Sequence, residues 1–362
     1  MSKWEYTESE IWRFGMGEAS ILHVFGLISE GDRVAAFAEA RHGNGGDAGC
    51  PHDIWMRRSR DGGRSFEENI CLCSGEGGRV WTNPVPVYDS RSKRLFLFYS
   101  DNPDNQRTEN FLIFSDDWGD TWSSPRRINA CLETGEAPPP FHLAGPGHGL
   151  QLTGGERAGR LIVPFWHRQW GPDRPAGERG YCISALYSDD HGENWHSTAY
   201  IGRDCLANES RIVETREGLL WIIRPVQPCR YACRSLDGGA TWTLPAPMPL
   251  GPANNCDAGA AGLRGKEEWG DMVLVSRVSA LKRRENMEIL ISLDGGGTFV
   301  ERMAMPAGDA VPGYSDLCVI GEKEPVVGLL HCRNNHVLFS RISLQTLTGG
   351  KYENTGRKVW LG

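Results

Sequence analysis

The 362-residue sequence predicts an all-β fold, a six-bladed β-propeller, and three observations support this prediction. A turn motif recurs five times, an apolar strand-like segment recurs six times, and no amphipathic helix of convincing length separates them. Repeats 53 to 66 residues apart, built only of short strands, are typical of propellers, whose blades are four-stranded sheets. Six such units account for most of the chain, so we expect one domain over residues 1–362 with no linker.

The turn motif reads Ser, any residue, Asp, any residue, Gly, any residue, a Thr-like residue and an aromatic residue. It is typical of a β-hairpin turn in which Asp accepts hydrogen bonds from turn amides and Gly supplies a positive φ. The aromatic residue is expected to pack beneath the hairpin. The Asp and Ser residues of the motif are therefore interpreted as structural, not catalytic. The five copies cover residues 59–66, 115–122, 188–195, 235–242 and 292–299.

The apolar segments form a second series that runs in step with the first. Their β-prone composition predicts one strand in each of six units, and five of these strands lead into a turn motif. The missing sixth motif indicates a last blade that is closed by joining the two ends of the chain. The segments cover residues 34–38, 95–99, 161–166, 219–223, 272–275 and 326–330.

The charge of the chain excludes two classes of partner. There are 39 Lys and Arg residues against 46 Asp and Glu residues, which gives a formal net charge of −7. This mild acidity argues against a strongly cationic nucleic-acid binder and a polybasic membrane binder. The longest apolar runs have five to seven residues, far fewer than the roughly 20 that a membrane-spanning helix needs. We expect neither nucleic acid nor membrane as a partner and leave the oligomeric state open.

The cysteines and histidines predict no metal and no cofactor. The 11 cysteines are scattered, and the near pairs Cys71/Cys73 and Cys229/Cys233 lack the CxxC spacing of a zinc or redox site. We interpret them mostly as reduced, partly buried thiols. The ten histidines show no ligand spacing, and no Gly-rich phosphate loop lies between a strand and a helix. The start, MSKWEYTESE, lacks a basic segment followed by an apolar stretch, so we expect a cytoplasmic protein.

The repeats carry different residue types at one position, which lies about 10 to 13 residues before each apolar segment. These positions are expected on or near the innermost strands, around one end of the central axis, where propellers usually carry their sites. Purely structural repeats would place similar residues there, so the variety indicates a site. The fifth unit is unclear around residues 255–257, and the other positions hold His23, Asn83, His148, Glu209 and Tyr314.

Arginines lie near these positions in the repeat frame, namely Arg41, Arg224 and Arg284. Guanidinium groups from separate blades that converge on one anion match a carboxylate bidentately. A glutamate beside a tyrosine withdraws the phenolic proton and makes the oxygen a nucleophile. A neutral nucleophile suits a reacting carbon that bears a carboxylate, because a charged Asp or Glu would be repelled there. A separate carboxylic acid must then protonate the leaving oxygen.

At these residues the sequence resembles the sialidase (neuraminidase) family, the exo-α-sialidases of the six-bladed propeller type. The resemblance covers nearly the whole chain. The turn motifs are like the Asp boxes of that family, which occur in other propellers too. The more specific segments are FAEARHGNGGDAG (37–49), GPGHGLQL (145–152), NESRIVETREGLLWIIR (208–224), RRENMEILISLDGG (283–296) and GYSDL (313–317).

The resemblance implies three catalytic residues. Tyr314 would be the nucleophile, Glu209 its general base and Asp47 the acid/base. Asp53 is the rival of Asp47, since an Asp in a Gly-rich loop is often only a turn former. Glu214 is the rival of Glu209 and is interpreted as structural.

The resemblance also implies the substrate-binding residues. Arg224 and Arg284 would bind the substrate carboxylate with Arg41 beside them, and Asn83 would touch the sugar. Arg283, adjacent to Arg284, is interpreted as a surface residue, and the histidine of GPGHG is expected to give structural support.

One departure from the family concerns the Arg-Ile-Pro motif of the first blade, whose arginine is the first member of the carboxylate-binding triad. The aligned stretch is HVFGLI, and His23 takes the place of that arginine, with Arg13 lying upstream. Replacing a bidentate guanidinium with an imidazole is expected to weaken carboxylate binding by about 1–3 kcal/mol. Three outcomes stay open: a weaker sialidase in which Arg41 compensates, a preference for another acid, or loss of hydrolysis.

The leading hypothesis is a retaining exo-glycosidase that releases a terminal α-linked sialic acid from glycoconjugates through a tyrosyl-linked intermediate. The first alternative is a hydrolase of a different 2-keto sugar acid of the Kdn, Kdo or pseudaminic type. A sugar-acid lectin without turnover is the second, and it conflicts with the Tyr–Glu–Asp set, since pure binding needs no nucleophile. A scaffold propeller of protein partners, which would bind no sugar acid, is the third.

Overall fold

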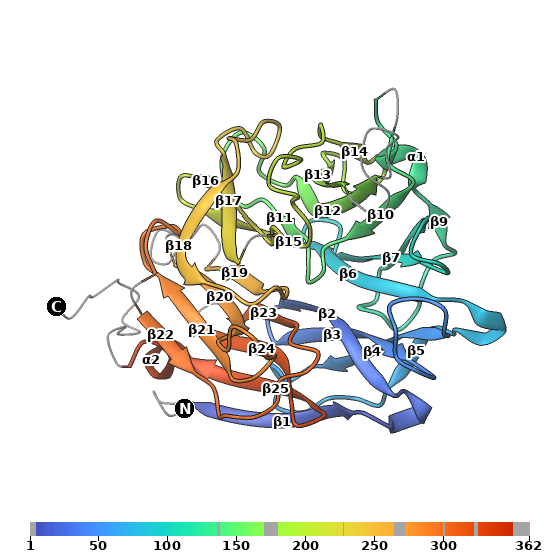
Figure 1. Ribbon diagram of the computed structural model, residues 1–362, viewed down its shortest axis with the longest axis vertical. Helices are drawn as coiled ribbons and strands as arrows, with labels where there is room; N and C mark the ends of the chain where they lie inside the picture. The colour runs from blue at the N-terminus through green and yellow to red at the C-terminus, as the bar shows by residue number, and fades with distance from the viewer. Residues whose placement is uncertain are drawn as a thin grey trace.

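Six antiparallel sheets are arranged in a ring around a central axis in the computed structural model, which confirms the predicted six-bladed β-propeller (Figure 1). The structure describes residues 5–135, 138–169, 180–226, 228–263, 272–299, 301–321 and 325–349. Each blade runs from an inner strand near the axis to an outer strand at the rim, in chain order except in the last blade.

The described residues of the first three blades form thirteen strands. Blade 1 comprises β2 (Ile21–Glu30), β3 (Arg33–Arg41), β4 (His52–Ser59) and β5 (Ile70–Cys73). Blade 2 comprises β6 (Trp81–Asp89), β7 (Arg94–Asp101), β8 (Glu109–Ser115) and β9 (Arg126–Arg127). Blade 3 comprises β10 (Phe141–Ala144), β11 (Leu150–Gln151), β12 (Leu161–Gln169), β13 (Gly180–Ser188) and β14 (His196–Ser197).

In the other three blades, the part of the chain that the structure describes forms twelve strands. Blade 4 comprises β15 (Ser210–Thr215), β16 (Gly218–Ile223), β17 (Cys229–Ser235) and β18 (Ala246–Pro252). Blade 5 comprises β19 (Gly259–Gly262), β20 (Val273–Val278), β21 (Met287–Ser292) and β22 (Glu301–Ala304). Blade 6 comprises β23 (Ser315–Ile320), β24 (Val326–Arg333), β25 (His336–Ser343) and β1 (Tyr6–Arg13).

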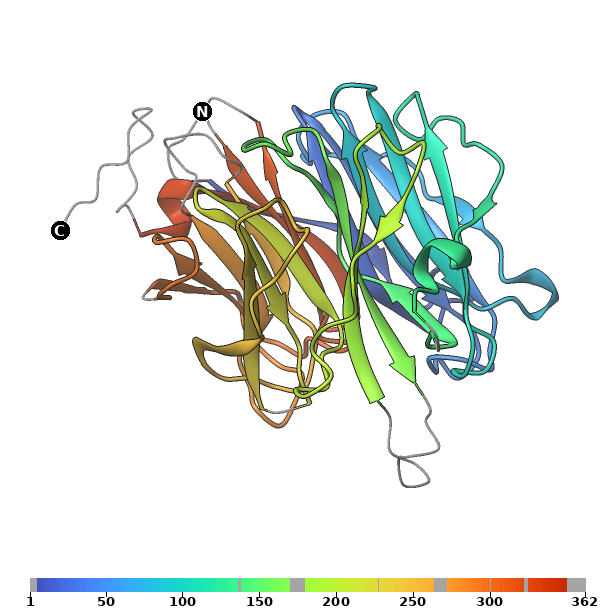
Figure 2. The same ribbon diagram turned by 90° about the horizontal axis from the view of Figure 1, so that it is seen from above.

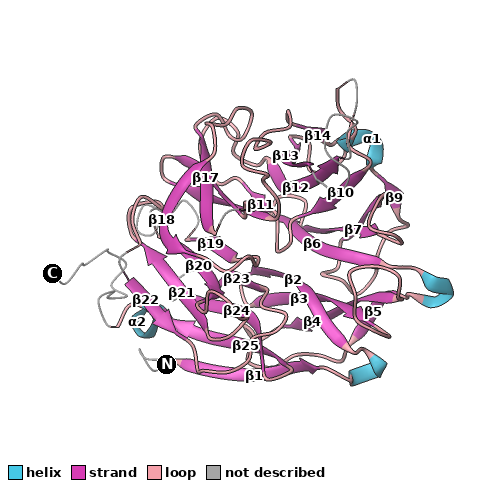
Figure 3. Ribbon diagram, viewed as in Figure 1, coloured by secondary structure: helices cyan, strands magenta, loops and turns pink. Residues whose placement is uncertain are grey.

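The few helical segments lie at the periphery of the ring (Figures 2 and 3). They are α1 (Asn129–Leu132), α2 (Leu344–Leu347) and two single 3₁₀ turns, Met16–Glu18 and Glu76–Gly78. No helix in the described ranges is long and apolar enough to cross a membrane. All eleven cysteines are free thiols and seven of them are buried, as the sequence analysis expected.

The six apolar segments form the second strand of each blade, namely β3, β7, β12, β16, β20 and β24. Only Met272 lies outside, one residue before β20. A second strand has a hydrogen-bonded neighbour on each side and another blade against each face. Both of its faces are therefore buried, which explains why its sequence is continuously apolar instead of alternating.

The five turn motifs connect the third and fourth strands of blades 1 to 5, as predicted. In blade 4, Asp237 accepts hydrogen bonds from Thr241 N (2.9 Å) and Thr241 Oγ1 (2.6 Å), and Ser235 Oγ accepts one from Gly239 N (2.8 Å). Gly239 has φ of 89°, and an added Cβ would lie 2.6 Å from Ile162 of the neighbouring blade. Trp242 packs under the hairpin against Trp221, with ring centroids 4.7 Å apart. The motif is therefore structural.

The ring is closed by the N-terminal strand, which explains the missing sixth motif. Strand β1 pairs antiparallel with β25 and is the outermost strand of blade 6 (Figure 1). Glu8 on β1 accepts two hydrogen bonds from Arg333, at 2.8 and 2.5 Å. The inferred joining of the two chain ends in the last blade is thus confirmed.

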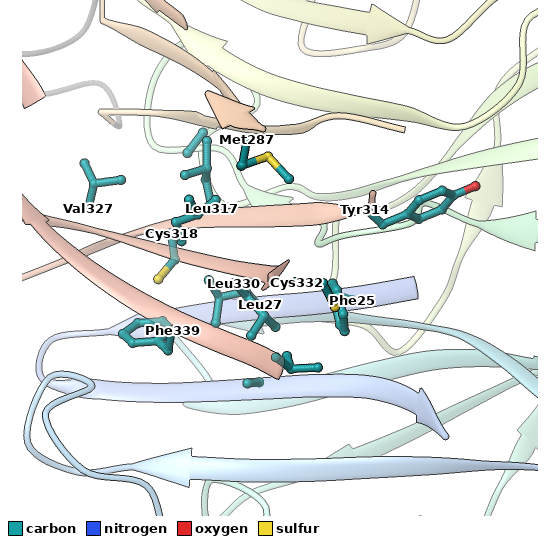
Figure 4. Close-up of a cluster of buried hydrophobic side chains, with 14 of the residues drawn as sticks. Phe25, Leu27, Met287, Tyr314, Leu317, Cys318, Val327, Leu330, Cys332 and Phe339 are labelled. Carbon is teal, nitrogen blue, oxygen red and sulfur yellow. The ribbon is translucent and has the colours of Figure 1, made fainter. Parts of the chain in front are cut away.

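The topology brings two kinds of strand end to one end of the axis. In each blade the inner and second strands are antiparallel, so the start of the inner strand lies beside the end of the second strand. Tyr314 directly precedes the inner strand β23 and lies at one end of a buried apolar cluster, with its oxygen pointing away from that cluster (Figure 4). Residues at these strand ends come from all six blades and surround the axis.

Candidate active site

A pocket of about 390 Å³ lies at this end of the axis, and it brings together every site residue that the sequence predicted. The residues come from blades 1, 2, 4, 5 and 6. They are His23, Arg41, Asp47, Asn83, Glu209, Arg224, Arg284 and Tyr314.

The phenol of Tyr314 is hydrogen bonded to the carboxylate of Glu209. Tyr314 Oη donates to Glu209 Oε1 at 2.5 Å, and both residues are buried. Arg224 Nη1 contacts Glu209 Oε2 and also lies 3.0 Å from Tyr314 Oη. These three groups therefore form one hydrogen-bonded unit at the floor of the pocket.

The environment keeps the Tyr314 phenol protonated in the free protein. Burial raises the pKa of Tyr314 well above its usual value, the charge of Glu209 raises it further, and the charge of Arg224 opposes them. A proton on the phenol and a carboxylate within hydrogen-bond distance are the arrangement that a nucleophile and its general base need.

The GYSDL segment places Tyr314 through its glycine. Gly313 has φ of 83°, a backbone conformation that residues other than glycine rarely adopt. A Cβ at this position would lie 2.9 Å from both Cys256 Sγ and Arg284 Cδ. Glycine therefore lets the chain turn into β23 while Arg284 packs against it.

Three guanidinium groups reach the pocket from blades 1, 4 and 5. Arg224 is held by Asn255, with Nε donating to Oδ1 at 3.0 Å and Nη2 to the carbonyl oxygen at 3.1 Å. Arg284 Nη1 donates to the Pro312 carbonyl at 2.5 Å, and its Cζ lies 5.7 Å from the centre of the Tyr314 ring. Arg41 is buried and pairs with two carboxylates, Glu39 and Asp47.

Asp47 is the exposed member of the set, with 71% of its side chain accessible. Its Oδ1 accepts a hydrogen bond from Arg41 Nη1 at 2.6 Å. Desolvation acts to raise the pKa of this carboxyl, but the charge and hydrogen bond of Arg41 outweigh it and hold the pKa below its usual value. In the free protein Asp47 is therefore ionised near neutral pH.

Asp53, the rival of Asp47, has a structural role. Its carboxylate contacts His42 Nε2 at 3.0 Å and accepts hydrogen bonds from Trp55 Nε1 (3.2 Å) and Gly75 N (2.7 Å). It does not line the pocket. The structure thus separates the two aspartates by location.

His23 packs on the nucleophile candidate as a neutral imidazole. Its ring centroid lies 4.2 Å from that of Tyr314, and the residue is 7% exposed. Neither ring nitrogen has a hydrogen-bond partner among the described residues. Burial lowers the pKa of His23 well below its usual value, and the charges of Arg41, Arg284 and Arg224 lower it further. The first-blade position is therefore polar but uncharged.

Asn83 lines the pocket at an irregularity of β6. It has φ of 52°, and the ladder register shifts between Thr82 and Val85. Its Nδ2 donates to the Ala144 carbonyl at 2.6 Å, and its backbone N–H donates to Glu39 Oε1 at 2.7 Å. Most of its hydrogen-bonding capacity is therefore used to join blades 1, 2 and 3.

Three other residues weighed in the sequence lie outside the pocket. His148 Nδ1 contacts Asp316 at 3.0 Å in the interior of the ring, which is the structural support expected of it. Glu214 accepts hydrogen bonds from the backbone and hydroxyl of Thr153. Arg283 has a side chain that is 80% exposed and pairs with Glu285.

Sequence reasoning missed Glu39 and one wall of the pocket. Glu39 is fully buried and accepts hydrogen bonds from Arg41, Thr82 and the backbone of Asn83. The sequence could have indicated Glu39, because it lies two residues before Arg41 on β3 and both side chains therefore lie on the same face of the strand. The missed wall is largely aromatic, belongs to blade 3, and consists of Phe141, Leu143, Trp166, Arg168 and Tyr181.

Comparison with known proteins gives the family. The BNR repeat-like domain model matches residues 32–332, most of the chain. An anhydrosialidase of Macrobdella decora is 28% identical in an alignment of 281 positions that covers 70% of this chain and 35% of that protein. A sialidase of Micromonospora viridifaciens is 27% identical in an alignment of 358 positions that covers 89% of this chain and 51% of that protein.

Solved structures agree on the fold. The Hadza microbial sialidase Hz136 superposes with a TM-score of 0.79 at 21% identity, over 94% of this chain and 69% of that one. A propeller of Asp-box blades with this pocket defines a protein of the BNR-repeat class. The chain belongs to that class, and the curated relatives and solved structures that it is similar to include sialidases. It spans from about a third to just over half of the length of the curated relatives that it matches first.

Proposed function

We propose that the protein is a retaining exo-glycosidase that releases a terminal α-linked sialic acid from a glycoconjugate through a tyrosyl-linked intermediate. The observation that carries the proposal is the hydrogen bond between Tyr314 Oη and Glu209 Oε1, with Arg224 on both groups. The sialidase relatives support sialic acid as the class of sugar.

In the first step, Glu209 takes the phenolic proton while Tyr314 Oη forms a bond to the anomeric carbon. The bond between that carbon and the leaving oxygen breaks, and Asp47 gives the leaving oxygen a proton. Arg224 and Arg284 hold the substrate carboxylate next to the nucleophile. A neutral phenol approaches a carbon that bears a carboxylate without the repulsion that an anionic nucleophile would meet.

In the second step, Asp47 takes a proton from a water molecule as the water oxygen bonds to the anomeric carbon. The bond to Tyr314 breaks, and Glu209 returns the proton to the phenolate oxygen. Two displacements at one carbon give net retention of configuration.

The ion pair between Arg41 and Asp47 controls the protonation state of Asp47 in the proposed mechanism. In the free protein Arg41 keeps Asp47 ionised. A substrate anion near Arg41 competes with Asp47 for the guanidinium, and so raises the pKa of that carboxyl on binding. Asp47 then gains the proton that it must donate, when the leaving oxygen is in place.

His23 is the observation that favours a second substrate. A neutral imidazole stands where the resemblance implies a triad arginine, and neither of its buried nitrogens has a hydrogen-bond partner among the described residues. A different 2-keto sugar acid of the Kdn, Kdo or pseudaminic type, with a hydroxyl that reaches this imidazole, is the alternative substrate.

Exchange of Tyr314 for Phe tests the proposed nucleophile. Loss of the phenolic oxygen is expected to lower kcat on a fluorogenic sialoside by at least about 10³-fold and to leave the fold intact. Turnover is measured by fluorophore release and folding by thermal unfolding. The matched control is Tyr187→Phe in β13, which lies outside the pocket and is expected to keep its activity.

A Y314F variant with a rate near that of the unmodified protein would end the tyrosine assignment. The anomer that appears first in the NMR spectrum of the product tests retention. A screen of Kdn, Kdo and pseudaminic-type glycosides in the same assay distinguishes the alternative substrate. Binding of a sialoside without any release would favour the lectin.

A further inference from the structure

We propose that Asn102 is a positioning residue for Asp47, holding the acid from the neighbouring blade. This inference rests on the proposed function, since it takes Asp47 as the acid/base. Asn102 follows β7 of blade 2, is 2% exposed and lines the same pocket.

The loop that carries Asp47 needs external support. It connects β3 and β4 and contains four glycines, at 43, 45, 46 and 49. Glycine-rich backbone loses more conformational entropy on ordering than other sequences. Within blade 1 the loop is held by His52 Nε2 on the Gly46 carbonyl (2.9 Å) and by Arg41 on the carboxylate itself.

The contact from blade 2 is made to the backbone of Asp47. Asn102 Nδ2 donates to the Asp47 carbonyl oxygen at 3.2 Å. The Arg41 contact is made to the reactive carboxylate of Asp47, and the substrate must break this contact when it binds. The Asn102 contact is made to the backbone, so it persists while the carboxylate changes partner and protonation state.

The orientation of the Asn102 amide is determined by its other partners. Its Oδ1 accepts from Asn105 N at 3.1 Å, so its NH₂ group faces Asp47 and donates its second hydrogen to Asn105 Oδ1 at 3.0 Å. The Asn102 backbone N–H donates to the Val80 carbonyl at 2.9 Å. These hydrogen bonds hold Asn102 in place, and its Nδ2 group reaches across the junction between blades 1 and 2.

The test compares two leaving groups on the same Asn102→Ala sample. A sugar alkoxide in 3′-sialyllactose needs protonation by Asp47, whereas 4-nitrophenolate in an aryl sialoside leaves without it. A misplaced acid is expected to lower kcat/KM about 10- to 100-fold on sialyllactose and less than about threefold on the aryl substrate. Partial unfolding of the variant lowers both rates equally, so it cancels in the ratio.

Two further variants are measured for comparison with Asn102→Ala. Asp47→Ala is expected to show the same dependence on the leaving group, in a stronger form. Asn110→Ala is the matched structural control, because Asn110 is a buried asparagine of the same blade that bonds to Ser100 and Thr108 and does not line the pocket. It is expected to lose stability with an unchanged ratio between the two substrates.

Equal losses on both substrates in N102A, or no loss on either, would overturn the role of Asn102 when D47A shows the leaving-group dependence. If D47A shows no such dependence, the acid assignment in the proposed function fails, and the role of Asn102 falls with it.

Discussion

The pocket is lined by four arginines and two acidic residues, so its charged side chains are in excess on the positive side. The arginines are Arg41, Arg168, Arg224 and Arg284, and the acidic residues are Asp47 and Glu209, while the buried Glu39 pairs with Arg41 outside the lining. His23 is uncharged and adds nothing to this excess. An anion that binds Arg41 must compete with Asp47, whereas Arg284 Nη1 is held by the neutral carbonyl of Pro312.

Restoring an arginine at position 23 is expected to strengthen binding of a sugar acid. His23 lies directly opposite Glu39 in the ladder between β2 and β3, so a guanidinium at this position has a carboxylate partner. We expect His23→Arg to lower the KM of a sialoside about 5- to 150-fold, which corresponds to about 1–3 kcal/mol. Michaelis–Menten kinetics on the fluorogenic sialoside measure this change.

The neutral variant His23→Gln is the control and is expected to bring no such gain. A folded H23R variant whose KM is unchanged or higher would show that position 23 does not contribute to binding of the substrate carboxylate.

Some of these residues could be predicted from the sequence and others could not. Tyr314, Glu209 and the arginines lie in segments whose residue types and repeat positions indicate chemistry. Asn102 lies in no such segment, because its role depends on which side chain it meets across a blade junction. Its contact with Asp47 joins residues 55 positions apart, and local patterns carry no information about such a pair.

At the scale of strands and turns, the inner strands are irregular on the side of the pocket. Strand β2 has a register shift after His23, and Val24 has φ of 45°, which is strained for a β-branched residue. The inner strand of blade 3 is interrupted between β10 and β11 at GPGHG. A Cβ at Gly147 would overlap the guanidinium of Arg211, so this break makes room for a buried arginine.

The turn motifs, by contrast, are regular, and their Asp residues are expected to stabilise the blades. Asp237→Ala removes three hydrogen bonds, from Ser235 Oγ, Thr241 N and Thr241 Oγ1. Because the turn is exposed and water replaces part of this bonding, we expect a loss of about 1–2 kcal/mol in the free energy of unfolding. Urea denaturation measures it, and Leu236→Ala in the same turn, at an 83% exposed residue, is expected to cost less than about 0.5 kcal/mol.

The same aspartate adds a pH dependence. Desolvation acts to raise its pKa, but the hydrogen bonds from Thr241 and Ser235 lower the pKa of Asp237 to about 2. Its unfolded value is about 3.9, so its stabilisation is complete above about pH 4 and is lost as the pH falls toward 2. A difference between D237A and the unmodified protein that stayed constant from pH 6 to pH 2 would contradict this account.

The elements themselves were largely predictable. Turn motifs and apolar second strands have strong local signals, so their number and order were correct. The bulges of β2 and β6 were not predicted, because they arise from packing around the axis between residues distant in the chain.

At the scale of the whole molecule, stability depends on the junction between β1 and the rest of blade 6. Glu8→Gln removes the charge from a bidentate pair with Arg333 in which the Glu8 side chain is 17% exposed. We expect a loss of about 2 kcal/mol in the free energy of unfolding, measured by urea denaturation at pH 7. Glu10→Gln on the same strand is the matched control and is expected to cost less than about 1 kcal/mol, because Glu10 and His336 are both about half exposed.

The contribution of Glu8 to the stability of the fold changes with pH in a defined direction. Burial acts to raise its pKa, but hydrogen bonds from His331 and Arg333 lower the pKa of Glu8 well below its usual range. Glu8 therefore stabilises the closed ring above its unfolded pKa, and this contribution declines as the pH falls below about 4. The stability gap between E8Q and the unmodified protein is expected to narrow in acid, and a gap that widened there would contradict the assignment.

The junction between the first and last blades also decides when the pocket exists during synthesis. His23 and Tyr314 are 291 positions apart in the chain, yet their rings touch across the contact between β2 and β23. A ribosome that has released the first five blades has therefore produced most of the residues that line the pocket but not Tyr314, the proposed nucleophile. The proposed mechanism therefore requires blade 6 to pack against blade 1, and a chain interrupted before that point is expected to have no activity at all instead of a lower rate.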